Sequence, residues 1–432
     1  MKKKFFICVA ALAALVLVAI VNAWPREQFV ASASKAATAP TADNIARGAY
    51  LALAGNCMAC HTARGGPAYA GGRAMATPFG ALYTPNITPD RATGIGAWSA
   101  DDFWRALHNG TSRDGRLLYP AFPYTNYTTV TRADADALYA FLHNLPAVQQ
   151  ANTAHALRFP YNQQAALAAW RLLYFKPGVF APNLAESPAW NRGAYLVEGL
   201  GHCSACHSSR NAAGAVTAGL DGGLIPTSGW YAPSLTSDAE AGLGSWGVLH
   251  IVQLLKTGVS PRSSVSGPMA EVVARSLQHL SDADVAAMAT YLKSLPATKT
   301  ETDEKARRQG NEKLHEPHID QIIAHGKQLY ASHCVDCHGA DGRGLAPAYP
   351  ALAGNRAVTM KHSVNAVRIV LNGGFTPGTA GNPRPYSMPP YGHLMNDAEV
   401  AAVVTYLRAA WGNAAPPVNA SEVNRYRSTP LD

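Results

Sequence analysis

Cysteine is scarce in this chain, with only 7 among 432 residues. Six of the seven lie in three widely separated C-x-x-C-H motifs: 57–61, 203–207 and 334–338. A structural zinc site needs four nitrogen or sulfur ligands, which isolated pairs do not supply. A disulfide would not need the histidine that follows each pair, and a thioredoxin-like motif would need a βαβ setting that the sequence lacks. The scarcity and spacing of cysteine therefore exclude three common roles.

Charged residues are also few, at 15%, and the net charge is +8. No patch of interleaved basic and aromatic residues occurs, so we expect no nucleic-acid partner. A mild basic excess suits an anionic membrane surface or an acidic partner. The sequence also lacks a Gly-rich dinucleotide loop before a βαβ unit, a nucleophile elbow and an H-E-x-x-H motif. We therefore expect no catalytic residues and no substrate site.

Long apolar runs are absent except near the start. Residues 5–21 are uninterruptedly apolar and follow Lys2, Lys3 and Lys4. Residues 1–24 are therefore predicted to be either a cleaved signal peptide or a retained membrane anchor. Residues 25–40 are predicted to be a spacer. Both alternatives place the rest of the chain outside the cytoplasm, on the periplasmic side of the bacterial inner membrane, anchored or peripheral.

The three motifs have the pattern that attaches c-type haem. Two thiols a turn apart form thioethers to the porphyrin, and the adjacent histidine supplies an axial nitrogen to iron. The sequence therefore predicts three covalently bound haem c groups. The predicted attachment residues and proximal ligands are Cys57, Cys60, His61, Cys203, Cys206, His207, Cys334, Cys337 and His338.

Repeated helix signals surround each motif. A Gly followed closely by an aromatic residue precedes all three, and a capped amphipathic pattern begins at Thr131, Ser281 and Asn396. An opening and a closing helix around a haem indicate an all-α fold of three tandem cytochrome c-like domains. The predicted boundaries are 41–148 for domain one, 188–298 for domain two and 318–412 for domain three.

The segments between these domains differ in character. Residues 149–187 are predicted to be a helical connector with an apolar helix from about Gln163 to Phe175, which either packs on its own domains or docks a partner subunit. Residues 299–317 are dense in charge and are predicted to be a solvated linker. Residues 413–432 are predicted to be a tail.

Methionines in the loops before two closing helices are candidate sixth ligands of iron. A thioether favours Fe(II) and raises the potential of an electron carrier. Met269 is the candidate in domain two, and Met388 is the candidate in domain three, with Met395 as a weaker alternative.

Domain one has Phe122 at the equivalent place, and phenylalanine cannot bind iron. Three possibilities stay open for this haem. His108 supplies a second histidine, which is the alternative we favour; or Met75 reaches over from the first loop; or the iron is five-coordinate and open to small ligands.

The segments Asn86–Asp90, Thr93–Ser99 and Asp114–Ala121, together with the three motifs, give the chain a family resemblance. It resembles the triheme cytochrome c subunits of bacterial membrane-bound dehydrogenases that oxidise alcohols, aldehydes, gluconate, sorbitol or fructose. The resemblance covers roughly residues 40 to 412. It implies a catalytic partner carrying PQQ, FAD or molybdenum, with electrons passing to ubiquinone or a terminal oxidase at the membrane.

In many members of that family a methionine stands where this chain has Phe122. The Phe form, together with residues 157–162, is more similar to cytochromes that accompany molybdenum hydroxylases of aldehydes or N-heterocycles. We therefore expect an electron-transfer subunit. A haem enzyme with an open, peroxidase-like first haem and a free-standing electron carrier are the alternatives.

Overall fold

The computed structural model describes residues 40–217, 219–225, 227–238, 242–298, 312, 314, 316–346 and 348–429. The predicted leader or anchor, nearly all of the spacer and most of the predicted charged linker lie outside these residues. Within the described part of the chain, no helix combines the length and apolar character needed to cross a membrane.

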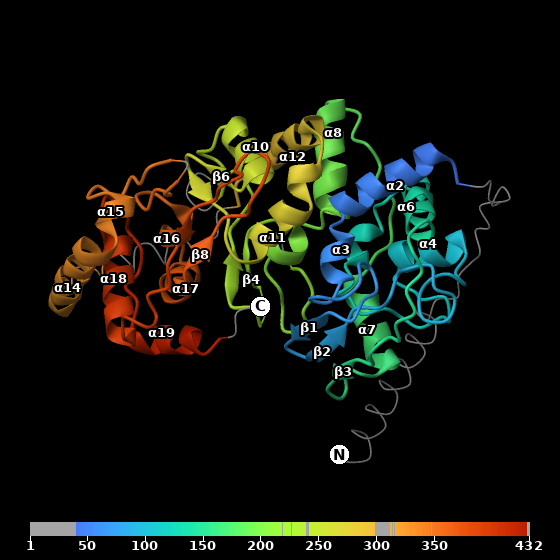
Figure 1. The fold of residues 1–432 in the computed structure, drawn as a ribbon, viewed down its shortest axis with the longest axis horizontal. Coiled ribbons are helices and arrows are strands. Elements are labelled where there is room, and N and C mark those ends of the chain that lie inside the picture. The colour runs from blue at the N-terminus through green and yellow to red at the C-terminus, as the bar shows by residue number, and fades with distance from the viewer. Residues whose placement is uncertain are drawn as a thin grey trace, which may run out of the picture. The chain divides into compact units, whose positions relative to one another are not determined.

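Residue contacts divide the chain into two compact units, which are coloured by residue number in Figure 1. Unit 1 comprises Met1–Ala52 and Cys60–Ala181, and unit 2 comprises Leu53–Ala59 and Pro182–Asp432. Helices form most of the regular structure in both units. The helical prediction is confirmed in this coarse form, but it did not include the small antiparallel sheets.

Unit 1 contains the first motif and the predicted connector. A three-stranded antiparallel sheet, ordered β1-β2-β3, lies beside its helices. The elements, with α2 and α3 crossing the division between the units, are α2 (Ala42–Ala54), α3 (Cys57–Cys60), β1 (Ala74–Thr77), β2 (Gly80–Tyr83), α4 (Ala100–Asn109), α5 (Tyr124–Tyr127), α6 (Arg132–His143), β3 (Ala156–Leu157) and α7 (Gln164–Tyr174).

Unit 2 contains the second and third motifs and three two-stranded antiparallel hairpins. Its elements up to the second closing helix are α8 (Pro188–Ala194), the π-helical turn η1 (Tyr195–Leu200), α9 (Ser204–His207), β4 (Gly223–Ile225), β5 (Trp230–Ala232), α10 (Val248–Thr257), β6 (Val259–Ser260), β7 (Ser263–Ser264), α11 (Pro268–Arg275), the 3-10 turn η2 (Leu277–His279) and α12 (Asp282–Ser294). The later elements are α14 (Pro317–His333), α15 (Val335–His338), α16 (Arg356–Thr359), α17 (Val364–Asn372), β8 (Gly374–Phe375), β9 (Ser387–Met388), α18 (Asp397–Ala409) and α19 (Ala420–Arg427).

An opening helix crosses a closing helix around each motif, and a glycine lies at each crossing. A Cβ on Gly48 would lie 1.9 Å from the Ala137 carbonyl oxygen. A Cβ on Gly193 would lie 2.0 Å from the Ala287 carbonyl oxygen, and a Cβ on Gly326 would lie 2.1 Å from the Ala402 carbonyl oxygen. These distances leave no room for any side chain, so glycine allows the two backbones to touch. In Figure 1, α14 and α18 show the third of these pairs.

Ion pairs join the helices at the first two crossings. The residue before the glycine is arginine in both cases, and it contacts an aspartate in the first turn of the closing helix. The Arg47 Nε donates to Asp134 at 2.7 Å. Arg192 binds Asp284 with two nitrogens, at 2.8 and 2.7 Å. This two-point geometry fixes the relative rotation of the helices.

The closing helices begin where the sequence predicts. Thr131 and Ser281 each accept a hydrogen bond from a backbone N–H three residues later, and Asn396 forms a full capping box with Glu399. These caps satisfy donors that the first turn leaves without helical partners.

The predicted connector and the predicted tail both contribute to cores. Leu167 and Ala168 of α7 are buried against Leu117, while Leu172 and Leu173 on the same helix are exposed. The predicted tail, residues 413–432, contains α19. Val418 and Val423 are buried in the core around α17 and α18, so the tail forms part of that core rather than extending from it.

Candidate functional site: three cysteine-histidine motifs

The cysteine pairs lie in short helical turns directly after the opening helices. Cys57 and Cys60 are the first and last residues of α3, whereas Cys203 and Cys334 are the N-cap residues of α9 and α15. In every pair the two cysteines are three residues, and so about one helical turn, apart. All six motif cysteines carry thiols rather than disulfides. Burial raises the pKa of Cys203 to about 12 and that of Cys334 to about 11. These two sulfurs therefore stay protonated at neutral pH, which suppresses disulfide chemistry.

Each motif histidine is held by the carbonyl of a proline in the following loop. The Nδ1 of His61 lies 2.8 Å from the Pro85 oxygen, and that of His207 lies 2.7 Å from the Pro233 oxygen. The corresponding distance from His338 to Pro350 is 3.0 Å. A carbonyl only accepts hydrogen bonds, so Nδ1 carries the proton and Nε2 keeps its lone pair.

Burial lowers the pKa of His61, His207 and His338, although the carbonyl partner raises it in part. The three imidazoles are therefore neutral at pH 7, which is the form that binds a metal. An outer partner on Nδ1 also orients the ring of a metal-binding histidine. The donor set fits a covalently attached haem: two thiols one turn apart beside a neutral, oriented imidazole.

The loop that carries Pro85 is fixed by the next residue. Asn86 is 2% exposed, and its Nδ2 donates to the Val148 carbonyl at 2.7 Å. Its Oδ1 accepts from the Thr88 backbone N–H at 2.9 Å. In the second loop, Ser234 accepts from the Thr236 N–H at 3.2 Å in the same position. Side-chain turns of this kind hold the preceding carbonyl toward the histidine.

These proline carbonyls were not identified from the sequence. A signal was present, because Thr84-Pro85-Asn86 and Ala232-Pro233-Ser234 occupy matching places in the first two repeats, and Tyr349-Pro350-Ala351 occurs in the third. The contact is made by the backbone oxygen of proline and not by its side chain.

Met269 lies in the first turn of α11, just after Gly267 and Pro268. Gly267 has φ of 55° and contacts the Trp230 ring, where a Cβ would lie 2.6 Å from the indole. Trp230 is also in strand β5, which leads directly to Pro233. The start of α11, which carries Met269, is therefore packed against the strand that leads to the loop orienting His207. The sequence predicts a loop at Met269, but the residue lies in a helix.

Met388 and Met395 occupy different surroundings. Met388 lies in β9, paired with Gly374, and packs at the margin of the core around α17 and α18. Met395 is 4% exposed and lies inside that core. The geometry leaves Met388 the more accessible thioether of the two.

The first repeat offers no methionine at the matching position. Phe122 packs against Tyr127, with ring centroids 5.3 Å apart. His108, in the last turn of α4, is stacked on Trp104 at 4.6 Å, and its Nδ1 lies 2.9 Å from the Thr128 carbonyl oxygen. Burial lowers the pKa of His108, and the carbonyl leaves its Nε2 lone pair unprotonated. Met75 is half-buried in β1.

Comparisons with known proteins identify related chains. A family model described as cytochrome c matches residues 45–146 and 323–411. The gluconate 2-dehydrogenase cytochrome c subunit of Pantoea cypripedii is 41% identical over 389 residues, covering 86% of each chain. The cytochrome c subunit of alcohol dehydrogenase (quinone) from Gluconobacter oxydans is 39% identical, covering 91% of this chain and 84% of that one. One of the subunits of nicotinate dehydrogenase from Pseudomonas putida is 41% identical over 84% of this chain, which spans 30% of that protein.

Proposed function

Because this chain belongs to the family of cytochrome c subunits of bacterial gluconate, alcohol and fructose dehydrogenases, we propose that it is a triheme electron-transfer subunit. It takes electrons from a dehydrogenase catalytic subunit and passes them to ubiquinone or a terminal oxidase. It works on the periplasmic side of the bacterial inner membrane, anchored or peripheral.

One observation carries this proposal: the contact from histidine Nδ1 to a proline carbonyl recurs after every C-x-x-C-H motif. Each site thus has two thiols for covalent attachment and one imidazole prepared for iron. When bound, haem c supplies reversible one-electron Fe(III)/Fe(II) chemistry. The protein residues fix the ring of the proximal ligand, exclude water by helix packing and supply the second axial donor.

Each haem iron also needs a second protein ligand. Met269 and Met388 are the proposed thioether ligands of the second and third haems, which favour the reduced iron. His108 is the proposed ligand of the first haem. Its Nδ1–H···O=C contact to Thr128 parallels the contact that orients each proximal histidine. A haem with two histidines has a lower potential than one with histidine and methionine, so the first haem differs from the other two.

The catalytic partner carries PQQ, FAD or molybdenum. Phe122 and the likeness to a nicotinate dehydrogenase subunit support a partner that oxidises an N-heterocycle. The equally high identity to a gluconate dehydrogenase subunit supports a partner that oxidises a sugar acid. A complex of this kind needs no substrate site on the cytochrome subunit. The cytochrome needs only an electron entry and an electron exit.

Haem stoichiometry tests the proposal. The expected result is three covalent haems per polypeptide in wild type, by mass and by haem absorbance, and two after Cys60→Ala, Cys206→Ala or Cys337→Ala. The purified complex is then expected to reduce a ubiquinone analogue when its dehydrogenase substrate is added. Two haems in wild type, or a cysteine substitution that leaves the count unchanged, contradicts it.

Phe122 favours a second candidate function, in which the first haem is open and acts on peroxide or another small ligand. An EPR and CO-binding comparison of wild type with His108→Ala separates the two. Electron transfer alone predicts three low-spin haems, one of which turns high-spin in the variant. A high-spin, CO-binding haem in wild type instead supports the haem enzyme.

A further inference from the structure

Helix α19 fastens two segments of the third repeat. Ser363, before α17, donates to the Glu422 carboxylate at 2.5 Å. Two residues later on α19, Asn424 donates to Asp397 at 2.8 Å. Val423 lies between these contacts and is fully buried. The helix therefore joins the start of α17 to the start of α18.

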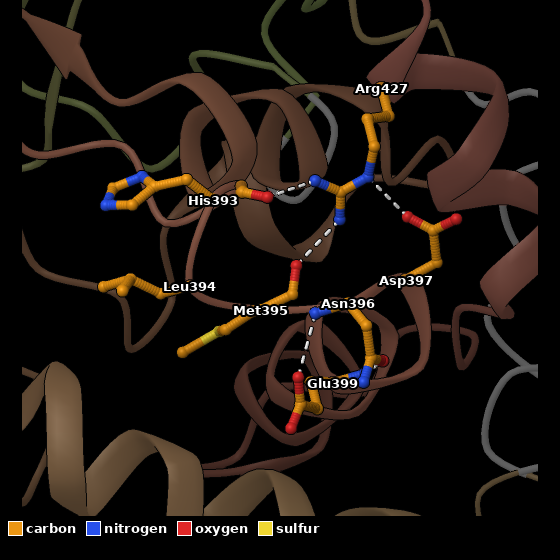
Figure 2. A pocket seen from close by; sticks show the side chains of 8 residues that line it. His393, Leu394, Met395, Asn396, Asp397, Glu399 and Arg427 are labelled. Atoms are coloured by element: carbon orange, nitrogen blue, oxygen red, sulfur yellow. Dashed lines mark hydrogen bonds and ion pairs between the residues drawn. The ribbon is translucent and has the colours of Figure 1, made fainter.

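Arg427 makes the most extensive of these contacts, as Figure 2 shows. Its Nε donates to Asp397 Oδ1 at 2.7 Å, and one terminal nitrogen donates to the Met395 carbonyl at 2.9 Å. The other terminal nitrogen donates to the Gly392 carbonyl. A planar guanidinium that binds three acceptors fixes their relative positions, which the point charge of a lysine would not do.

The segment that Arg427 holds, residues 392–397, follows Met388 and contains Met395. It lines an open cavity of about 460 Å³. The cavity is bordered by residues 392–397, Glu399 and Arg427. At the Met388 end, α17 holds the chain, because Tyr391 and Gly392 donate backbone N–H groups to Val370 and Leu371, each at 2.9 Å. Arg427 thus holds the Met395 end of the same loop.

The position of Met395 follows from this restraint. Its carbonyl faces the guanidinium while its thioether extends away (Figure 2), into the core, with 4% exposure. Met388 lies at the margin of that core. The chain thus has two thioethers seven residues apart, and Arg427 holds the backbone at the second of them.

We propose that Arg427 is a positioning residue that selects Met388, rather than Met395, as the iron ligand of the third haem. The inference rests on the proposed function, because it requires a haem at the third motif. Arg427 touches neither the motif nor Met388. It acts by keeping the Met395 backbone and the end of the loop in place.

Arg427→Ala tests this, with Arg425→Ala as the matched control. Arg425 has the same charge and lies on the same helix, but its side chain is exposed. The readouts are the long-wavelength charge-transfer band of methionine-bound Fe(III) and the rate at which cyanide displaces the methionine. Loss of charged hydrogen bonds predicts cyanide binding at least about tenfold faster in Arg427→Ala, with wild-type rates in Arg425→Ala. Equal rates in the two variants overturn the proposal.

Ligand identity is tested by adding Met388→Leu or Met395→Leu to each background. In wild type and in Arg425→Ala, only Met388→Leu is expected to remove the third-haem band. In Arg427→Ala, Met395→Leu is also expected to diminish it. Arg427→Lys, which keeps the charge but loses the fork, is expected to behave like Arg427→Ala. The proposal is refuted if Arg427→Lys binds cyanide at the wild-type rate. It is also refuted if adding Met395→Leu to Arg427→Ala leaves the third-haem band unchanged.

Haem count separates this inference from the proposed function. Three haems are expected in every variant, because none of these residues lies in an attachment motif. A wild-type protein with three haems but no Met388-dependent band refutes only the ligand selection. A missing third haem in wild type refutes the proposed function. Asp397→Asn, which weakens the Arg427 contact without removing a side chain, replaces Arg427→Ala if that variant fails to fold.

Discussion

Three glycines determine how closely the paired helices approach. At Gly48, Gly193 and Gly326 the carbonyl of an alanine on the closing helix occupies the space of a side chain. The clash is with backbone, which cannot rotate away as a side chain can. Even one methyl group must therefore separate the helices, and this would disturb the motif that follows the opening helix.

Gly326→Ala is expected to lower the free energy of unfolding by about 1–3 kcal/mol, the usual cost of overpacking. Denaturant unfolding of the haem-loaded protein, followed by circular dichroism, measures it. Gly378→Ala is the control, because a Cβ there meets no atom within 4 Å. If both variants lose the same stability, the close helix contact is not the cause.

Site residues could be proposed from the sequence only where their side chains carry the chemistry. The cysteines and histidines were recognisable because thioether attachment requires those side chains at that spacing. The Pro85, Pro233 and Pro350 contacts were not, because every residue has a carbonyl and only the folded loop shows which one meets a histidine. Phe122 likewise shows that no methionine stands at the matching position of domain one, but not which residue replaces it as a ligand.

At the scale of elements, caps and apolar periodicity located the closing helices. The hairpins were missed because strands of two to four residues are too short to show an alternating pattern. Helix α19 was missed for a different reason: few of its residues are apolar, and it is held by polar contacts of Glu422, Asn424 and Arg427 with distant segments. Contacts between distant residues are invisible in a local pattern.

Helix α6 contributes a pH-dependent stability through His143 in its last turn. Burial lowers the pKa of His143, and its contact with the Tyr139 carbonyl opposes this in part. In the unfolded chain the His143 imidazole has a pKa of about 6.5, so it binds a proton more readily there than in the folded protein. The stabilisation is complete above about pH 6.5 and is lost as the pH falls toward the lower folded-state value.

His143→Gln is expected to reduce this loss of stability at acid pH while changing little at pH above about 7. Denaturant midpoints of the wild type and the variant across this range measure the difference. His318→Gln, at a side chain that is 67% exposed, is the control. An unchanged acid profile in His143→Gln contradicts the assignment.

At the scale of the whole molecule, the second and third repeats share unit 2 through direct contacts. The Asn365 side chain forms two hydrogen bonds with the Tyr231 backbone, accepting at 2.9 Å and donating at 2.8 Å. Arg368, fully buried on the same helix, lies 5.0 Å from the Trp230 ring. The joint therefore holds strand β5, and with it the loop that orients His207.

Asn365→Ala is expected to loosen this joint by about 1–3 kcal/mol, the sum of two ordinary hydrogen bonds. Hydrogen exchange of the Tyr231 amide, which Asn365 protects, is the direct measurement, and an increase of about tenfold or more is expected. Asn372→Ala, at the end of the same helix α17, is the control, because its amide nitrogen has no hydrogen-bond partner among the described residues. Equal exchange rates of the Tyr231 amide in the two variants contradict the assignment of these hydrogen bonds to the joint.

The pairing of opening and closing helices also sets an order of assembly. Each motif leaves the ribosome well before the helix that closes over it: His61 before α6, His207 before α12 and His338 before α18. We therefore expect each cysteine pair to reach the periplasmic side before its closing helix does, which leaves the two thiols accessible for haem attachment. We expect the sites to close in chain order, with the third completed only when α19 follows, because this helix holds the Met395 loop.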